Sequence, residues 1–339
     1  KLQSRGFKVA ACGFKCVASR SSPQMNRRQF CNRIIVSLLA SPALAASSSA
    51  KMPTRVLGRT GIKVPILGFG SGSRFLMYPN EEQAIAALNR AIDLGITYID
   101  TAHAYGGGKS EERIGRVMAT RRNEVILATK LPARTADQAR CQIELSLKRL
   151  RTDHLDVLHI HDLKSAQDLA AIQARGGVLE ALYEARDQKV TRAIGITCHA
   201  NPTALKAALE QHDFDCTQMA LNAGLASMAD APSGMKAAPA GAGSFERLAL
   251  PVATRKHMGV IAMKVFGQEQ LLGAAPVEKL LAYALSLPVS LASVGMPRLD
   301  HIENNATMAR SFTPLSARQR RRLADSIESG RQQAMLRFF

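Results

Sequence analysis

The 339-residue sequence contains no tryptophan, and aromatic residues make up only 5% of it. Proteins that bind single-stranded nucleic acids stack bases on aromatic side chains, so the net charge of +18 alone does not indicate a nucleic-acid partner. No apolar run approaches the roughly 20 residues that a membrane-spanning helix needs. Because 46% of the residues are hydrophobic, the chain can bury a substantial core. We therefore expect a folded protein with no nucleic-acid partner and no stable membrane insertion.

The cysteine pattern and the glycine pattern each exclude a class of site. Three of the six cysteines precede residue 32, and the others, Cys141, Cys198 and Cys216, are odd in number and far apart. This spacing predicts neither a disulfide framework nor a CxxC metal site. The glycines of "GFGSG" at 68–72 are not followed by the helix that an open-sheet dinucleotide motif requires. We expect no bound metal.

The first 45 residues contain eight basic residues and no acidic residue. Arg27 and Arg28 precede a short apolar run at 34–40, and Ala43-Leu44-Ala45 follows as a small-residue cleavage site. This order is typical of an export signal, and Arg27-Arg28-Gln29-Phe30 resembles the twin-arginine type. We interpret residues 1–45 as upstream sequence plus a cleavable signal read by the export machinery. The predicted location is the periplasm, or the cytoplasm if the signal does not function.

From residue 63 onward, short β-rich runs alternate with amphipathic stretches. The stretches predict helices that begin near Glu81, Ser110, Thr135, Gly177, Pro202, Ser244 and Pro276. Eight such units favour an α/β fold, a single-domain (β/α)8 TIM barrel over residues 52–320, with a basic C-terminal helix and tail at 321–339. A doubly wound open sheet is the competing arrangement. The predicted strands are 64–70, 97–100, 124–130, 155–161, 192–197, 216–221, 259–264 and 291–296.

One connection is longer than the others. Residues 222–243, between the sixth and seventh predicted strands, are rich in alanine, glycine and proline. Loops of this length in a compact domain are usually functional or disordered. The segment is therefore either an active-site lid or a disordered insertion.

Polar side chains stand at the carboxyl ends of consecutive predicted strands. Asp100 ends the second strand, Lys130 the third and His161 the fourth, and Tyr105 follows the second. In a barrel these ends converge on one mouth, where chemistry is placed. A tyrosine with a pKa of about 10 needs a nearby cation to lower that pKa, and Lys130, held by Asp100, can provide it. With His161 as a hydrogen-bond donor, the set suits protonation of a carbonyl oxygen.

These residues also carry a family resemblance. Asp-Thr-Ala-x-x-Tyr-Gly at 100–106, Ser110-Glu111, Lys130 at a strand end and the run from Leu150 to His161 together resemble the aldo-keto reductase family. The resemblance implies a (β/α)8 barrel that binds NADPH, with NADP favoured over NAD, and passes a hydride to an aldehyde or ketone. By this resemblance the catalytic residues are Tyr105 as proton donor, Lys130 and Asp100 as its activating pair, and His161 as the group that orients the carbonyl.

The same resemblance implies a set of cofactor-binding residues. Gln218 and Thr197 would contact the nicotinamide amide, and residues of the late barrel segment would read the adenine and the 2′-phosphate. The expected cofactor-binding residues are Gly70, Ser71, Thr197, Gln218, Arg298, His301 and Asn305.

Two alternatives remain open from the sequence. His159, His161 and His199 could form a three-histidine zinc site in a barrel hydrolase. The barrel could instead hold a nucleotide with little turnover, as a sensor or a partner subunit. Neither the substrate beyond a small carbonyl compound nor the oligomeric state can be read from the sequence.

Overall fold

A computed structural model describes residues 51–229, 236–239 and 243–336, and all of them belong to one compact unit of the chain. The predicted export signal at residues 1–45 lies outside the described residues. Over the ranges that are described, no helix is both long and apolar enough to cross a membrane.

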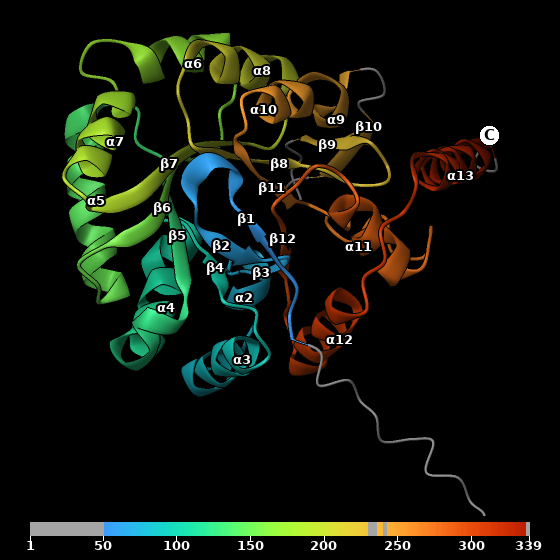
Figure 1. Ribbon diagram of the computed structural model, residues 1–339, viewed down its shortest axis with the longest axis horizontal. Helices are drawn as coiled ribbons and strands as arrows, with labels where there is room; N and C mark the ends of the chain where they lie inside the picture. Colours follow the sequence, from blue (N-terminus) through green and yellow to red (C-terminus); the bar gives the residue numbers. More distant parts are fainter. Residues whose placement is uncertain (1–50, 230–235, 240–242, 337–339) are drawn as a thin grey trace, which may run out of the picture. The chain divides into compact units, whose positions relative to one another are not determined.

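Eight parallel strands close into a barrel, as Figure 1 shows in a view down the molecule's shortest axis. The last barrel strand pairs with the first, so this sheet is closed and the open-sheet alternative is wrong. Each observed strand overlaps the segment that the sequence pattern predicts. The barrel strands are β3 (Leu67–Gly70), β4 (Tyr98–Asp100), β5 (Ile126–Leu131), β6 (Leu155–Ile160), β7 (Thr191–Cys198), β8 (Cys216–Ala220), β11 (Gly259–Met263) and β12 (Leu291–Gly295).

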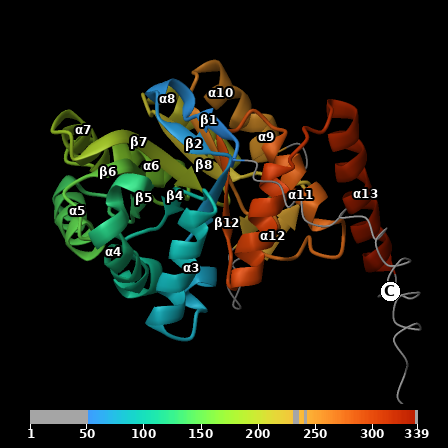
Figure 2. The ribbon, with the colours of Figure 1, turned by 60° about the horizontal axis from the view of Figure 1, so that its bottom comes forward.

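The interior of the barrel is filled near the amino ends of its strands. Seven strands each contribute one buried side chain there, and β3 contributes Gly68, whose Cβ would meet the side chains of Leu291 and Tyr98. A hairpin of β1 (Thr54–Val56) and β2 (Lys63–Pro65), joined through the 3-10 helix η1 (Gly58–Thr60), adds Leu57, Ile62 and Val64 to this cluster. The hairpin, blue in Figure 2, closes this end, so only the carboxyl ends remain to form a site.

Helices cover the outside of the barrel and bury their apolar faces against the strands. Several begin at a residue whose side chain accepts a backbone N–H, such as Asn80, Thr135 and Asn201, which is why the sequence predicts their starts well. The described helices are α2 (Ser73–Leu76), α3 (Glu81–Asp93), η2 (Tyr105–Gly108), α4 (Lys109–Arg121), η3 (Arg122–Glu124), α5 (Ala136–Leu150), α6 (Ala166–Gln173), α7 (Val178–Asp187), α8 (Pro202–Gln211), α9 (Phe245–Leu248), α10 (Leu250–Arg255), α11 (Val277–Leu285), α12 (Leu299–Arg310) and α13 (Ala317–Leu336).

The long connection at 222–243 contains a hairpin in its described residues. Strands β9 (Ala226–Ala229) and β10 (Lys236–Pro239) pair antiparallel. The Met228 amide donates to the His199 carbonyl at 2.9 Å, so β9 is attached to the chain just after β7, and the Met228 side chain is buried. The hairpin therefore lies beside the mouth of the barrel.

Helices α4 and α5 pack closely at Gly115 of α4. A Cβ placed there would lie 2.0 Å from the carbonyl oxygen of Arg149 in α5. Since backbone cannot give way as a flexible side chain can, Gly115→Ala should lower the free energy of unfolding by about 1–3 kcal/mol, measured by urea denaturation. Gly330→Ala in α13 is the control, because its Cβ would meet no atom within 4 Å. Equal stability of the two variants would contradict this packing of α4 on α5.

Candidate active site

A buried ion pair between Asp100 and Lys130 lies at the centre of the barrel mouth. The Lys130 Nζ donates to the Asp100 Oδ1 at 2.6 Å and to the Thr101 carbonyl at 2.7 Å. The two residues are only 4% and 1% exposed, so water contributes little to their solvation. Neighbouring strands β4 and β5 bring them together, because Asp100 pairs with Ala128 and Lys130 follows on the same inward-facing side.

Two side chains from distant strands complete the solvation of Asp100. Gln218 Nε2 of β8 donates to the Asp100 Oδ2 at 2.8 Å, and Ser293 Oγ of β12 donates to the same oxygen at 3.0 Å. Burial raises the pKa of Asp100, but the charge and hydrogen bonds of Lys130 and Gln218 outweigh it, and the pKa is lowered. Burial lowers the pKa of Lys130, but Asp100 and Tyr105 raise it by more, so the net shift is upward. Both groups stay charged at neutral pH.

Tyr105 begins the short helix η2 directly after β4. Gly106 and Gly107, which follow it, have φ of 60° and 66°, a left-handed conformation that glycine adopts without strain. This tight turn places the Tyr105 ring over Lys130, with 5.2 Å between the ring centroid and Nζ. The phenol therefore lies beside the cation that the sequence assigns to it.

The pKa of Tyr105 differs in direction from the expectation. We expected Lys130 to lower it below its ordinary value. Burial, together with the charges of Asp100 and Asp162, raises the pKa of Tyr105 by more than the charge of Lys130 and the hydrogen bond with Lys130 lower it, so the net shift is upward. Tyr105 thus remains a protonated phenol at neutral pH, ready to donate, and Lys130 limits the cost of forming the phenolate.

His161 follows β6 and faces Tyr105, with 5.6 Å between the ring centroids in an edge-to-face arrangement. Burial, and then the positive charge of Lys130, lower the pKa of His161 to about 3. The imidazole is therefore neutral over the physiological range. It can offer an N–H to a ligand oxygen without carrying a charge of its own.

The three histidines of the zinc alternative do not form a metal centre in the described part of the chain, where no group of three or more His, Cys, Asp or Glu is arranged to hold an ion. His161 and His199 have ring centroids 6.0 Å apart. His159 is fully buried on β6, and neither of its ring nitrogens has a hydrogen-bond partner. Its pKa is lowered to about 3 by burial and by Lys130.

A cavity of about 490 Å³ opens above these residues. Asp100, Tyr105 and His161 line it, together with Gln218 and Ser293. The Oε1 atom of Gln218 is buried and has no hydrogen-bond partner. An amide oxygen left unsatisfied in this way is free to accept a hydrogen bond from a ligand or a water molecule.

The predicted cofactor-binding residues fall into three groups. Gly70 and Gln218 line the cavity. The hydroxyls of Ser71 and Thr197 are engaged inside the fold, Ser71 donating to the Asp100 carbonyl at 2.7 Å and Thr197 accepting from the Asp162 amide at 2.8 Å. The remaining three belong to the segment at α12 and do not line the cavity: Arg298, His301 and Asn305.

Within that third group, the arginine already has a partner. Arg298 is exposed and donates to Asp300 at 2.9 and 2.7 Å, whereas Asn305 is buried. The structure also brings residues to the cavity that the sequence analysis did not select, among them Arg74, Asp162, Lys264 and Ser293. Lys264 follows the seventh strand, so the strand-end rule that selected Lys130 could have found it.

Comparisons with known proteins give a family match and several similar proteins. A sequence profile of the aldo/keto reductase family matches residues 66–236, which is half of the chain. The L-galactose dehydrogenase of Arabidopsis thaliana is 35% identical over 159 residues, covering 43% of this chain and 49% of the relative. The D-threo-aldose 1-dehydrogenase of a Pseudomonas species is 29% identical over 250 residues, covering 64% of this chain and 70% of the relative.

Solved structures share the fold. An aldo/keto reductase from Klebsiella pneumoniae, in complex with NADP and acetate, has a TM-score of 0.63 at 22% identity, over 80% of this chain and 94% of that one. At that identity the similarity shows the barrel and nothing finer. The matched part of this chain spans about half the length of several curated relatives.

The buried histidines predict acid-sensitive stability. His159, His161 and His199 have pKa values far below the ordinary 6.5, so the unfolded chain takes up protons first as the pH falls. The free energy of unfolding should therefore be at its full value above pH 6.5 and should decrease as the pH falls below 6.5. Between pH 7.5 and 5.5 we expect a loss of about 1.4 kcal/mol per histidine, about 4 kcal/mol in all, measured by urea denaturation.

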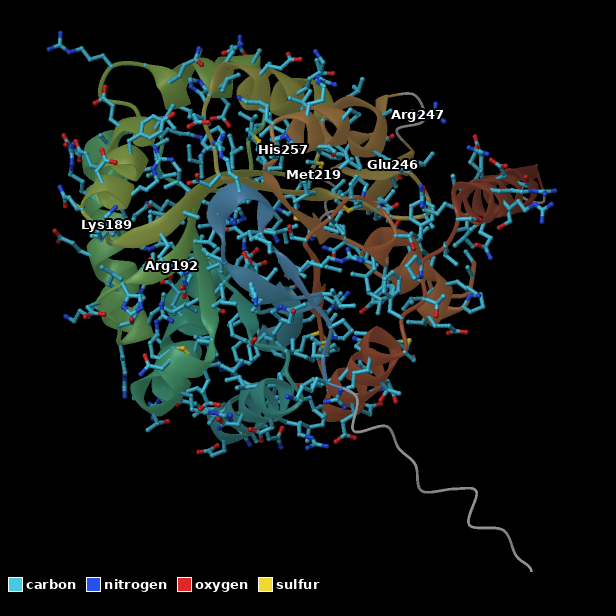
Figure 3. The ribbon with its side chains drawn as sticks, in the orientation of Figure 1. Lys189, Arg192, Met219, Glu246, Arg247 and His257 are labelled. Carbon is cyan, nitrogen blue, oxygen red and sulfur yellow. The ribbon has the colours of Figure 1, made fainter. Side chains whose placement is uncertain are left out.

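Two variants test the origin of this loss. His159→Gln should remove about a third of it, because one of the three titrating groups is gone. His257→Asn, at an exposed position labelled in Figure 3, should leave it unchanged. A pH dependence that is the same in wild type and His159→Gln would show that His159 is not held neutral.

Proposed function

This chain belongs to the aldo/keto reductase family, and on that premise we propose that it reduces aldehydes or ketones to alcohols with NADPH as the hydride donor. The observation that carries the proposal is the contact of Tyr105 with the buried Lys130–Asp100 pair at the wall of an open cavity. The substrate class and the cofactor are part of the proposal, since the chain matches only about half of several relatives.

The mechanism uses Tyr105 as the acid. Its O–H protonates the carbonyl oxygen as negative charge develops there, and the positive charge of Lys130 stabilises the phenolate left behind. Asp100 keeps Lys130 charged and fixed in spite of its burial. NADPH, when bound, supplies the hydride that the protein side chains cannot.

His161 orients the carbonyl group. Because its imidazole is neutral, it donates one N–H to the carbonyl oxygen and does not compete with Tyr105 as a proton source. Its edge-to-face contact with Tyr105 places both donors on one side of the cavity. A carbonyl oxygen between them would accept both hydrogen bonds.

The residues present fit the nicotinamide end of the cofactor. Gln218 lines the cavity, its Oε1 is buried without a hydrogen-bond partner, and a carboxamide N–H would satisfy it. Arg298, His301 and Asn305 would hold the 2′-phosphate and adenine, with Arg298 exchanging its exposed partner Asp300 for phosphate. The relative solved with NADP supports NADP over NAD for this chain.

The scope of the enzyme follows from the cavity lining. Apolar residues, among them Leu76, Val265 and Phe266, stand next to the polar catalytic groups. Such a mixture suits small carbonyl compounds without one dominant shape. We propose a broad range of small aldehydes, with the sugar substrates named for two relatives among the candidates.

We also propose that the protein is exported to the periplasm with its cofactor bound. The support is the sequence of residues 1–45 alone: the paired arginines, the short apolar run and the small-residue cleavage site. Export of folded protein is a property of the twin-arginine pathway, and a barrel that binds NADPH would need to fold first.

Tyr105→Phe tests the proposed chemistry. It removes the proton donor and keeps the ring, so kcat for reduction of a panel of aliphatic and aromatic aldehydes should fall at least about 100-fold. The rate is followed by NADPH absorbance, and the affinity for NADPH, measured by fluorescence, should not change.

Tyr183→Phe is the matched control, because this tyrosine lies on α7 with its ring 5.2 Å from the Arg186 guanidinium carbon, away from the cavity. It should keep full activity. Tight NADPH binding by the wild type without turnover of any carbonyl would favour the nucleotide-holding alternative. Activity that survives Tyr105→Phe would contradict the assignment of the acid.

A further inference from the structure

A second cavity, of about 640 Å³, is lined by residues of helices α3, α4 and α5 and of the turns next to them. These helices are neighbours on the outside of the barrel (Figure 1). The cavity shares no lining residue with the catalytic cavity. Two of its lining residues are acidic, Glu81 and Glu112, and six are basic. We call it the basic cleft, after Lys109, Arg113, Arg116, Lys148, Arg149 and Arg151.

Half of the cations in the basic cleft have no partner in the protein. Within the described ranges, no hydrogen bond or ion pair joins the side chains of Lys109, Lys148 or Arg151 to another residue. Other cations on the same helices are paired, since Arg121 of α4 and Arg140 of α5 each contact two carboxylates. The unpaired positive charge is therefore gathered at the cleft.

Arg113 brings a buried guanidinium group to the same cleft. The residue is only 3% exposed. Its Nη1 and Nη2 atoms donate to the carbonyls of Phe75 and Tyr78 at 3.0 and 3.1 Å, whereas its Nε has no hydrogen-bond partner. A buried donor of a charged group is costly to leave unmatched. The Nε–H is therefore available to a ligand oxygen.

Arg149 connects the basic cleft to the loop that carries Tyr105. Its guanidinium group donates to the carbonyls of His103 and Gly107, on either side of Tyr105, at 3.2 and 3.4 Å. It also donates to the Glu111 carboxylate at 3.4 Å. Hydrogen bonds that involve a charged group are usually about 2.7–2.9 Å long. These contacts are longer than that, so a phosphate oxygen would be a stronger acceptor for Arg149.

The charge and the size of the basic cleft indicate the class of ligand. Glu81 is paired with Arg116, which leaves Glu112 to oppose the three unpaired cations. A single carboxylate would offset only one of these charges, whereas a chain of phosphate groups offers several, and arginine forks match phosphate oxygens. A volume of about 640 Å³ is that of a small-molecule site.

We propose that the basic cleft binds a small molecule that carries two or more phosphate groups, and that this ligand acts on Tyr105 through Arg149. The ligand gives Arg149 a stronger acceptor than the carbonyls of His103 and Gly107. It thereby loosens the turn that places Tyr105 over Lys130. The site itself goes beyond the proposed function, and only the consequence for turnover rests on it.

Calorimetry with inorganic tripolyphosphate, in magnesium-free buffer, tests the site on the full-length protein. Lys109→Met/Lys148→Met removes two cations from the cleft, and Lys63→Met/Lys279→Met removes two exposed cations elsewhere and has the same net charge. We expect one tripolyphosphate per chain, bound about 10-fold or more weakly by the cleft variant and with near wild-type affinity by the control. Arg151→Asn, which suits the left-handed backbone there, is a second cleft variant and should also weaken binding. Thermal melts show whether each variant is folded.

Amide hydrogen exchange tests the connection to Tyr105. Near-saturating tripolyphosphate should speed the exchange of the amides at residues 103–109 in the wild type and in Lys63→Met/Lys279→Met. At the same concentration the effect should be much smaller in Lys109→Met/Lys148→Met, because less ligand is bound. A role of Arg149 that is only structural would not make this exchange depend on the anion.

Three results would overturn parts of the proposal. Equal tripolyphosphate affinity in the two folded double variants overturns the site, because the anion then binds elsewhere. A wild type that binds tripolyphosphate no more tightly than orthophosphate overturns the class of ligand. Binding in the cleft with unchanged exchange at 103–109 overturns the action on Tyr105. Since no arm uses nucleotide or turnover, failure of the proposed function is a separate result, visible as absent NADPH binding.

Discussion

The structure of the site depends on one interaction, the buried ion pair between Asp100 and Lys130. Each charge alone would be costly to hold at 4% and 1% exposure, so neither residue is tolerable there without the other. Gln218 from β8 and Ser293 from β12 donate to the remaining carboxylate oxygen, so four strands of the closed barrel contribute to one carboxylate. Closure of the sheet is what brings β8 and β12 to the same point as β4 and β5.

The charge of Lys130 then sets the protonation of its neighbours. It opposes the rise in the pKa of Tyr105, and together with burial it keeps His159 and His161 neutral. The neutral imidazole of His161 can donate a hydrogen bond to a carbonyl oxygen, and the phenol of Tyr105 can donate the proton, so the two groups have separate roles.

The sequence predicted most of the fold because its strands and helices obey local rules. The β-rich runs overlap all eight barrel strands, and helices begin at capping residues such as Thr135 and Asn201. Asp100, Lys130 and His161 could be selected because strand ends converge in a barrel. The direction of the Tyr105 pKa shift could not be predicted, since burial and the nearby carboxylates together outweigh the effect of Lys130 and no local pattern measures burial. The ion pair between Arg298 and Asp300 could not be predicted either, because exposed side chains can pair with any of several neighbours.

A double-mutant cycle on Asp100 and Lys130 tests the central claim most directly, with the free energy of unfolding measured for Asp100→Asn, Lys130→Met and the combination. Each single variant leaves a buried group without its partner and should lose about 3–5 kcal/mol, whereas the combination should lose clearly less than the sum of the two. This result would show that the pair acts as one unit. Losses that simply add would contradict the account, because they would mean that the two charges do not depend on each other.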